Sequence, residues 1–277
     1  MQDTPAQEAN GPVAEQAESA SGDYAIAGSR RIYVAAGDRR GMELIAKGGD
    51  LNPNRLKVWN RLLSAASWTH VIDVGANYGE MLVNMNVDAA TSVTAIEPNA
   101  DILPLLHKTL AEAGIAATIL PVATGDRNGV AKFFVNRNWS GMSRLAGTDT
   151  GNESATDFMI VPMLTLREII GSEAANARLL VKIDVEGFER SVLAGLSDSL
   201  GQMDSFAALT EVLHLGDDDV RDILTSFDVY LYDIAEDKFV HVVPPELSRF
   251  KELRADPRHY WNDVVVRRRG DPAIGSR

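Results

Sequence analysis

The sequence predicts an α/β fold in which helices cover both faces of a mainly parallel β-sheet. Short apolar runs alternate with stretches of helical periodicity between residues 70 and 267, which is the pattern of consecutive βαβ units. Several runs are apolar throughout instead of alternating with polar residues, as expected for strands buried on both faces. We therefore assign one domain, from about residue 24 to residue 269.

The residues before 68 divide into a tail and a cap. Residues 1–22 contain a single large aliphatic residue, Val13, and are predicted to be a disordered tail because they cannot bury enough apolar surface. Residues 23–67 are predicted to form an N-terminal cap, with an edge hairpin or cap at 31–35 and a helix at 55–65. Asn52 and Pro53 suit the start of this helix.

The main domain is placed at 68–269, followed by a frayed tail at 270–277. Its predicted strands are 70–74, 93–96, 118–122, 179–185, 207–213, 229–234 and 264–267, with helices at 101–113 and after Gly187. About 55 residues between the third and fourth strands interrupt the alternation. They hold two strand-like stretches, 130–135 and 158–163, around a polar loop at 136–153 whose length is typical of a functional segment.

Composition excludes several classes of protein. The formal net charge of −12 argues against nucleic-acid binding, which needs a concentrated cationic face. The absence of cysteine excludes disulfides, thiolate zinc sites and cysteine nucleophiles. The sequence contains neither a secretory signal nor an apolar run of roughly 20 residues that could cross a bilayer. We therefore expect a soluble, cytoplasmic protein.

The sharpest motif follows the first strand, where Gly75 and Gly79 permit a tight turn and a close approach to a ligand. Open parallel sheets bind ligands at this edge, beside the start of the next helix, expected here near Tyr78. A dinucleotide fingerprint needs glycine where Asn77 and Glu80 stand. A carboxylate at position 80 would repel a diphosphate but tolerate a cofactor that carries an amine and a sulfonium.

Two carboxylates flank this turn. Asp73 can accept from the ammonium group of a bound amino acid, directly or through water. Glu97 ends the second strand and can accept from both hydroxyls of a ribose, which would serve NAD and S-adenosylmethionine alike. A purely structural glycine turn remains the alternative interpretation.

The sequence resembles the FkbM-type family of S-adenosylmethionine-dependent methyltransferases over residues 68–266. The matching segments are IDVGANYG at 72–79, IEPN at 96–99, PVATGD at 121–126, VKIDVEGFE at 181–189 and EVLH at 211–214, with a closing strand near Asn262. The resemblance implies a class I, Rossmann-like fold with seven strands, the last of them antiparallel. It also implies O-methylation of sugar hydroxyls in glycans or of hydroxyls on small metabolites.

The resemblance also implies a cofactor site, residue by residue. Asp73, Gly75, Asn77 and Gly79 would line the methionine part of S-adenosylmethionine, Glu97 would hold the ribose, and Ala123 and Asp126 would lie near the adenine. Ala76, Pro98 and Asp184 are assigned to the same site. The residues before 68 match no known pattern, so the acceptor side has no assignment.

Five ionisable residues close the fourth and fifth predicted strands. Lys182 and Asp184 lie two apart and share a face, Glu186 follows them, and Glu211 and His214 end the next strand. An alcohol is a poor nucleophile while protonated, so a base or a metal ion is expected near the methyl group.

Three hypotheses for these residues remain open. His214 could be the general base, oriented by Asp184 or Glu211. Alternatively, Asp184, Glu186 and Glu211 could bind an ion such as Mg²⁺, which prefers oxygen ligands. In the third hypothesis Lys182 pairs with Glu211 in a structural network, and positioning alone drives catalysis.

The acceptor is expected to be a small molecule, sugar or glycan. The loop at 136–144 could close over the site, with Trp139 either stacking on a sugar ring or anchoring the loop by packing. Two rival functions are an NAD-dependent oxidoreductase on a similar sheet and a non-catalytic binding scaffold.

Overall fold

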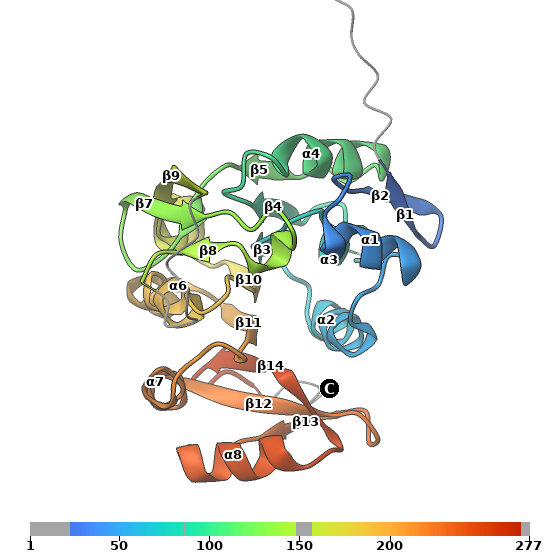
Figure 1. Ribbon diagram of the computed structural model, residues 1–277. Helices are drawn as coiled ribbons and strands as arrows, with labels where there is room; N and C mark the ends of the chain where they lie inside the picture. The colour runs from blue at the N-terminus through green and yellow to red at the C-terminus, as the bar shows by residue number, and fades with distance from the viewer. Residues whose placement is uncertain (1–22, 86, 148–156, 273–277) are drawn as a thin grey trace, which may run out of the picture.

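The computed structural model describes residues 23–85, 87–147 and 157–272 (Figure 1). The predicted tail at 1–22 lies outside these residues, as does most of the predicted tail at 270–277. The described residues form an eight-stranded sheet, a four-stranded sheet and a two-stranded sheet. In these parts of the chain, no helix has both the length and the hydropathy needed to span a membrane.

The eight-stranded sheet has the order β13-β12-β14-β11-β10-β3-β4-β5. Its strands are β3 (His70–Val74), β4 (Ser92–Ile96), β5 (Thr118–Leu120), β10 (Arg178–Ile183), β11 (Ser205–Glu211), β12 (Phe227–Asp233), β13 (Lys238–His241) and β14 (His259–Arg268). Winding proceeds outward from β3 through β4 to β5 and, on the other side, from β10 to β11, so the topological switch point lies between β3 and β10.

This sheet corrects the expected strand count and direction. We predicted seven strands with only the last antiparallel, but the sheet has eight, and both β13 and β14 run against the others. The extra strand, β13, forms a hairpin with β12 at the edge of the sheet. With four residues, none of them fully buried, β13 lacks the apolar run by which the other strands were recognised.

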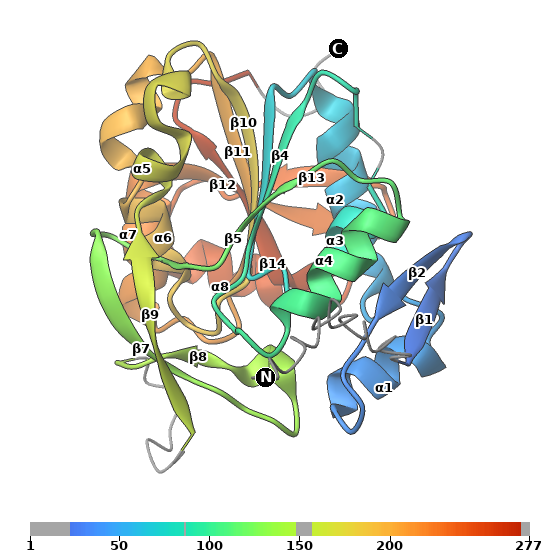
Figure 2. The ribbon, with the colours of Figure 1, turned by 90° about the horizontal axis from the view of Figure 1, so that it is seen from above.

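Helices cover both faces of this sheet (Figure 2). One face packs against α5 (Leu166–Ile170), α6 (Glu189–Ala194), α7 (Asp217–Ser226) and α8 (Leu247–Ala255), and the other against α2 (Pro53–Ala65), α3 (Glu80–Val83) and α4 (Leu103–Glu112). Short 3₁₀ helices lie at η1 (Ser140–Met142), η2 (Gly171–Ala174) and η3 (Ser197–Gln202). Adjacent strand residues enter opposite cores, as Val71 and Ile72 do, which is the period-two arrangement of a strand buried on both faces.

The N-terminal segment packs beside α4. Strands β1 (Tyr24–Ala27) and β2 (Arg30–Tyr33) form a hairpin, and α1 (Arg39–Ala46) follows. A third buried cluster joins this hairpin and α1 to Tyr78 and Ile102 of the main domain. Helix α2 begins as predicted, because the side chain of Asn52 accepts a hydrogen bond from the backbone N–H of Arg55.

The insertion between β5 and β10 forms the four-stranded sheet, in the order β6-β9-β7-β8. Its strands are β6 (Ala123–Thr124), β7 (Gly129–Phe134), β8 (Arg144–Leu145) and β9 (Phe158–Leu164). The two long strands, β7 and β9, match the strand-like stretches expected at 130–135 and 158–163. Part of the predicted loop at 136–153, from residue 148 on, lies outside the described residues.

Candidate active site

The turn after β3 is held against the neighbouring strands. The backbone N–H groups of Gly75 and Ala76 both donate to the carbonyl of Ile96, at 3.0 Å. Gly75 has a φ of +78°, and a Cβ on it would lie 2.1 Å from the carbonyl oxygen of Asp184. Only glycine fits this position, because a side chain would collide with the backbone after β10.

The helix after this turn is shorter than expected. Asn77 and Gly79 both have positive φ values, 47° and 86°, so helical geometry begins only at Glu80 and continues for four residues. We expected the helix to start near Tyr78 and to present free amide groups to a ligand. Instead, the N–H of Asn77 donates to Glu97, and that of Gly79 donates to the carbonyl of Ala76.

Glu97 stands at the end of β4 with 4% of its surface exposed. One carboxylate oxygen accepts from the N–H of Asn77 and the other from the N–H of Asn99, both at 2.8 Å. Burial raises the pKa of the Glu97 carboxyl above its usual range. Each oxygen retains the capacity to accept a further hydrogen bond from a ligand.

An apolar pocket opens beside Glu97. Its walls come from the ends of β3, β4 and β10 and from the four-stranded sheet, and they include Val74, Ile96, Pro98, Val122, Ala123, Phe133 and Leu145. Its walls also include Gly75 and the polar residues Asn77, Glu97, Asp184 and Glu186. The structure thus brings together six residues assigned to the cofactor from the sequence, namely Gly75, Asn77, Glu97, Pro98, Ala123 and Asp184.

Other residues assigned to the cofactor lie elsewhere. Asp126 is exposed and pairs with Arg127, so it does not line the apolar pocket. Gly79 caps α3 against Leu106. Ala76 lines the neighbouring pocket described below.

Asp73 is fully buried and does not line the apolar pocket. It lies 3.2 Å from the Nζ of Lys182, its register partner on β10, and Lys182 also donates to the carbonyl of Gly75 at 2.9 Å. Burial raises the pKa of the Asp73 carboxyl, although the charge of Lys182 opposes this shift. Asp73 therefore contacts the turn through Lys182. Its contact with the ligand's amino group, directly or through water, stays a prediction.

The expected pair of Lys182 with Glu211 is absent. Lys182 faces Asp73 directly across β3 and β10, while its partner on β11 is Leu209, two residues before Glu211. The guanidinium of Arg55, from α2, binds Glu211 instead, at 2.9 Å. The hypothesis of a Lys182–Glu211 network is therefore wrong.

Arg55 joins three carboxylates from three neighbouring strands. Besides Glu211, it binds Asp184 at 2.6 Å and Asp263 of β14 at 3.0 Å. Burial would raise the pKa of the Asp184 carboxyl, but Arg55 and then Lys182 outweigh it and lower this pKa to about 2. Asp184 is therefore ionised and paired with Arg55. It was one of the two residues suggested to orient His214 and one of the three expected ligands of a metal ion, but it does not belong to the cluster that converges on His214.

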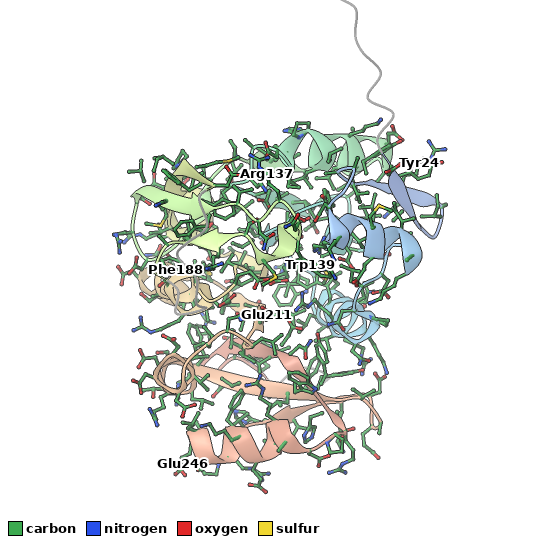
Figure 3. All side chains as sticks on the ribbon, in the orientation of Figure 1. Tyr24, Arg137, Trp139, Phe188, Glu211 and Glu246 are labelled. Carbon is green, nitrogen blue, oxygen red and sulfur yellow. The ribbon has the colours of Figure 1, made fainter. Side chains whose placement is uncertain are left out.

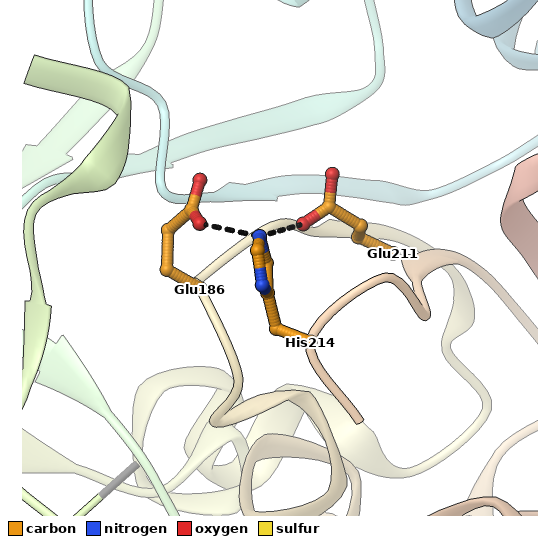
Figure 4. Close-up of side chains that lie close together, drawn as sticks. All are labelled: Glu186, Glu211 and His214. Atoms are coloured by element: carbon orange, nitrogen blue, oxygen red, sulfur yellow. Dashed lines mark ion pairs between the residues drawn. The ribbon is translucent and has the colours of Figure 1, made fainter. Parts of the chain in front are cut away.

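Glu186, Glu211 and His214 converge beyond the ends of β10 and β11 (Figure 4). The Nε2 of His214 lies 3.0 Å from Glu186 and 4.0 Å from Glu211. Burial, reinforced by the charge of Asp184, raises the pKa of both glutamates. Glu186 is thus the nearest carboxylate to His214, whereas the sequence suggested Asp184 or Glu211 for that role.

A charged pocket adjoins the apolar pocket. Trp139 and Glu211 line it from the 136–144 loop and from β11 (Figure 3), together with Arg40, Lys47 and Arg55 of the N-terminal cap. The two pockets share Arg40, Gly75, Gly141, Asp184 and Glu186. Glu186 lines both pockets and Glu211 lines the charged one, whereas His214 lines neither, so the cluster adjoins the boundary of the pockets through its two glutamates.

The loop at 136–144 does lie over the site. Ser140 and Gly141 of η1 line the apolar pocket. Asp38, the N-cap of α1, accepts from the backbone N–H and the hydroxyl of Ser140 and from the hydroxyl of Tyr78. This buried carboxylate holds the loop, the cap and the turn after β3 together.

Arg40 and Arg55 were missed by sequence reasoning. Arg40 binds Asn77 at 3.1 Å and Glu80 at 3.0 Å, and Glu80 also accepts from the N–H of Leu51. Because Arg40 compensates the charge of Glu80, the presence of Glu80 is no longer an argument against a bound diphosphate. Neither arginine stands in a recognisable motif, and each reaches the site only because the cap packs against the sheet.

A model of the methyltransferase FkbM domain matches residues 73–234, more than half of the chain. The chain belongs to the FkbM methyltransferase family. The FkbM match contains the turn after β3, Glu97 and the cluster that includes His214. It excludes α1 and α2, so Arg40 and Arg55 come from a part of the chain that the FkbM domain does not cover.

Solved structures similar to this FkbM-family chain include two methyltransferases. One is the O-methyltransferase from Bacillus cereus in complex with SAH, at 11% identity and a TM-score of 0.39, covering 82% of this chain and 87% of that chain. The other is precorrin-6y C5,15-methyltransferase from Geobacter metallireducens GS-15, at 10% identity and a TM-score of 0.40, covering 80% and 90%. Among curated proteins, none matches this chain.

Proposed function

We propose that this chain transfers a methyl group from S-adenosylmethionine to a hydroxyl of a sugar, a glycan or a small metabolite. The observation that carries the proposal is the junction of two unlike pockets at the switch point of the sheet. One is apolar and contains Glu97, while the other is charged, and Gly75, Asp184 and Glu186 line both. A donor and an acceptor bound in adjoining pockets would meet at this boundary.

The residues present fit the donor. Gly75 has no side chain, so the backbone after β10 approaches the turn closely and both segments line the apolar pocket. Glu97 offers acceptors for ribose hydroxyls, and Val122 and Ala123 offer an apolar surface for a base. The sulfonium of the bound donor supplies a methyl group already activated for displacement, so this chain's own task is to align the acceptor oxygen and exclude water.

The acceptor hydroxyl would lose its proton at the Glu186–Glu211–His214 cluster. As the oxygen bonds to the methyl carbon, the carbon–sulfur bond breaks and its electron pair returns to sulfur. In the absence of an ion, His214 is the proposed general base and Glu186, 3.0 Å from its Nε2, orients the imidazole. The products are a methyl ether and S-adenosylhomocysteine.

Ligand-dependent unfolding tests the donor assignment. We expect S-adenosylhomocysteine to raise the unfolding temperature, because a ligand at a hundredfold its Kd stabilises the native state by about 2.7 kcal/mol. NAD⁺ should give no such shift. Stabilisation by NAD⁺ alone would replace the proposal with its rival, a dehydrogenase.

Variants separate donor binding from turnover. Glu97→Ala should weaken S-adenosylhomocysteine binding in calorimetry, whereas His214→Ala should bind it normally. Mass spectrometry of glycans and metabolites from cells with and without the gene should reveal a missing methyl group. Expression of His214→Ala in the cells without the gene should not restore this group. The matched control is His241→Ala, since His241 is similarly exposed and pairs with Asp228 at 3.6 Å, far along the sheet from the pockets. Full restoration by His214→Ala would exclude His214 from the reaction.

A further inference from the structure

Three potential ligand atoms converge within the cluster described above. The Nε2 of His214 and one oxygen each of Glu186 and Glu211 lie within 4.8 Å of one another. The two distances from His214 Nε2 are 3.0 Å to Glu186 and 4.0 Å to Glu211 (Figure 4). Around an octahedral ion with bonds of about 2.1 Å, neighbouring ligands are about 3.0 Å apart and opposite ligands about 4.2 Å apart. The observed spacing needs only small side-chain rotations to enclose an ion.

An unsatisfied oxygen points into the same space. Glu211 has 6% of its surface exposed, and its Oε2 is buried without a hydrogen-bond partner, while the other oxygen accepts from Arg55. The unsatisfied Oε2 is the atom that faces His214. A buried carboxylate oxygen with no donor is costly, so this atom indicates a missing positive partner.

The charge of the surroundings also favours a cation. The ion pairs around the cluster join five carboxylates, on Asp73, Asp184, Glu186, Glu211 and Asp263, to the two cations Arg55 and Lys182 and to His214. Arg40 also lies nearby, but it pairs with Glu80. Arg55 and Lys182 do not contact Glu186 or the free oxygen of Glu211, for which His214 is the nearest nitrogen, at 3.0 and 4.0 Å.

We propose that Glu186, Glu211 and His214 bind one divalent first-row transition ion, such as Mn²⁺, at the boundary of the two pockets. This ligand set differs from the Mg²⁺ site expected from the sequence, because His214, and not Asp184, offers the third atom within 4.8 Å of the two glutamates. An imidazole nitrogen favours transition ions over Mg²⁺, which prefers oxygen ligands.

The role of the ion in catalysis rests on the proposed function. Three protein ligands leave positions on the ion for the acceptor hydroxyl and for water. A bound ion lowers the pKa of a coordinated hydroxyl, so the proton can pass to water in the charged pocket as the oxygen takes the methyl group. His214 would then act as a ligand and not as the general base.

Direct binding of the metal alone tests the proposal. In calorimetry and in electron paramagnetic resonance, we expect the chelator-treated protein to bind one Mn²⁺ with at least tenfold higher affinity than Mg²⁺. Glu211→Gln and His214→Ala should each weaken Mn²⁺ binding at least tenfold, while S-adenosylhomocysteine binding persists as proof of folding. Asp228→Asn and His241→Ala, which alter a two-residue histidine–carboxylate pair, should leave Mn²⁺ binding unchanged.

The outcomes are distinct. If the wild-type protein binds S-adenosylhomocysteine but no Mn²⁺ or Zn²⁺ at millimolar concentration, the metal site is refuted while the proposed methyl transfer stands, with His214 as the base. Equal Mn²⁺ binding by wild type and Glu211→Gln would also refute it. If Mn²⁺ binds as expected but S-adenosylhomocysteine does not, the site stands and the proposed function fails.

Discussion

Two independent constraints exclude a Cβ atom at Gly75, one from its backbone conformation and one from a tertiary contact. Its φ of +78° favours glycine by itself, and the Asp184 carbonyl would lie 2.1 Å from any Cβ. The second constraint is the more severe, since a backbone carbonyl cannot rotate away as a side chain can. The turn after β3 and the segment after β10 therefore touch through backbone atoms, which brings Asp184 to the edge of the apolar pocket.

The substitution Gly75→Ala separates these two constraints. We expect it to lower the free energy of unfolding by more than the roughly 1–2 kcal/mol of left-handed strain, because the β10 segment must also move. Gly147→Ala is the control, since Gly147 has a φ of +91° but no atom of the described residues lies within 4 Å of its Cβ position. Urea unfolding of both variants measures the difference. Equal losses would show that the contact with Asp184 has no energetic weight.

At the scale of elements, the junction between β10 and α6 depends on Glu189. This residue begins α6 with 1% of its surface exposed, and its carboxylate accepts from the backbone N–H groups of Val185 and Gly187. The turn so held includes Glu186, whose φ is +57°. Burial raises the pKa of the Glu189 carboxyl to about 7, although the backbone N–H groups oppose the shift.

This raised pKa predicts a loss of stability with rising pH. Between the unfolded pKa of about 4.3 and the folded value near 7, the native state holds a proton that the unfolded chain has released. The free energy of unfolding should therefore fall across that interval, by on the order of 3 kcal/mol for this group. Glu189→Gln should reduce the fall by this group's share, as measured by urea unfolding between pH 4.5 and 8.

The control for this experiment is Glu168→Gln, which alters an exposed acid in the first turn of α5. Its difference from wild type should not vary with pH over the same interval. If the Glu189→Gln and wild-type curves also run parallel, the junction does not hold a proton in the native state.

At the scale of the whole molecule, Arg55 fastens the N-terminal cap to the sheet. It extends from α2 to Asp184, Glu211 and Asp263, on three strands that lie side by side. Its side chain is 14% exposed, so the ion pairs are largely shielded from water. Removal of one partner from such a network leaves buried charges uncompensated.

Arg55→Met should therefore destabilise the protein by about 3–5 kcal/mol. Arg61→Met, on the same helix, is the matched control, because Arg61 is half exposed and lies 3.8 Å from Asp237. We expect the control to change stability by less than about 1 kcal/mol. Thermal and urea unfolding measure both variants. A loss for Arg55→Met no larger than for the control would mean that the cap is held by its apolar contacts alone.

The amino-acid sequence by itself determined the strands, the turn at Gly75 and the position of Glu97. These features follow from local patterns: apolar runs mark buried strands, and glycine marks a backbone conformation that other residues avoid. The FkbM resemblance rested on the same local segments, and the family match confirmed it. The short strand β13 was not predicted, because an edge strand need not be apolar.

Only the tertiary structure decided which side chains meet. Strand register pairs Lys182 with Asp73 and not with Glu211. The packing of α2 places Arg55 beside Asp184, with which it forms an ion pair. Glu186 is then the carboxylate nearest to His214. Contacts of this kind join residues more than a hundred positions apart. Their geometry depends on how whole helices and strands pack, and local sequence patterns do not indicate this packing.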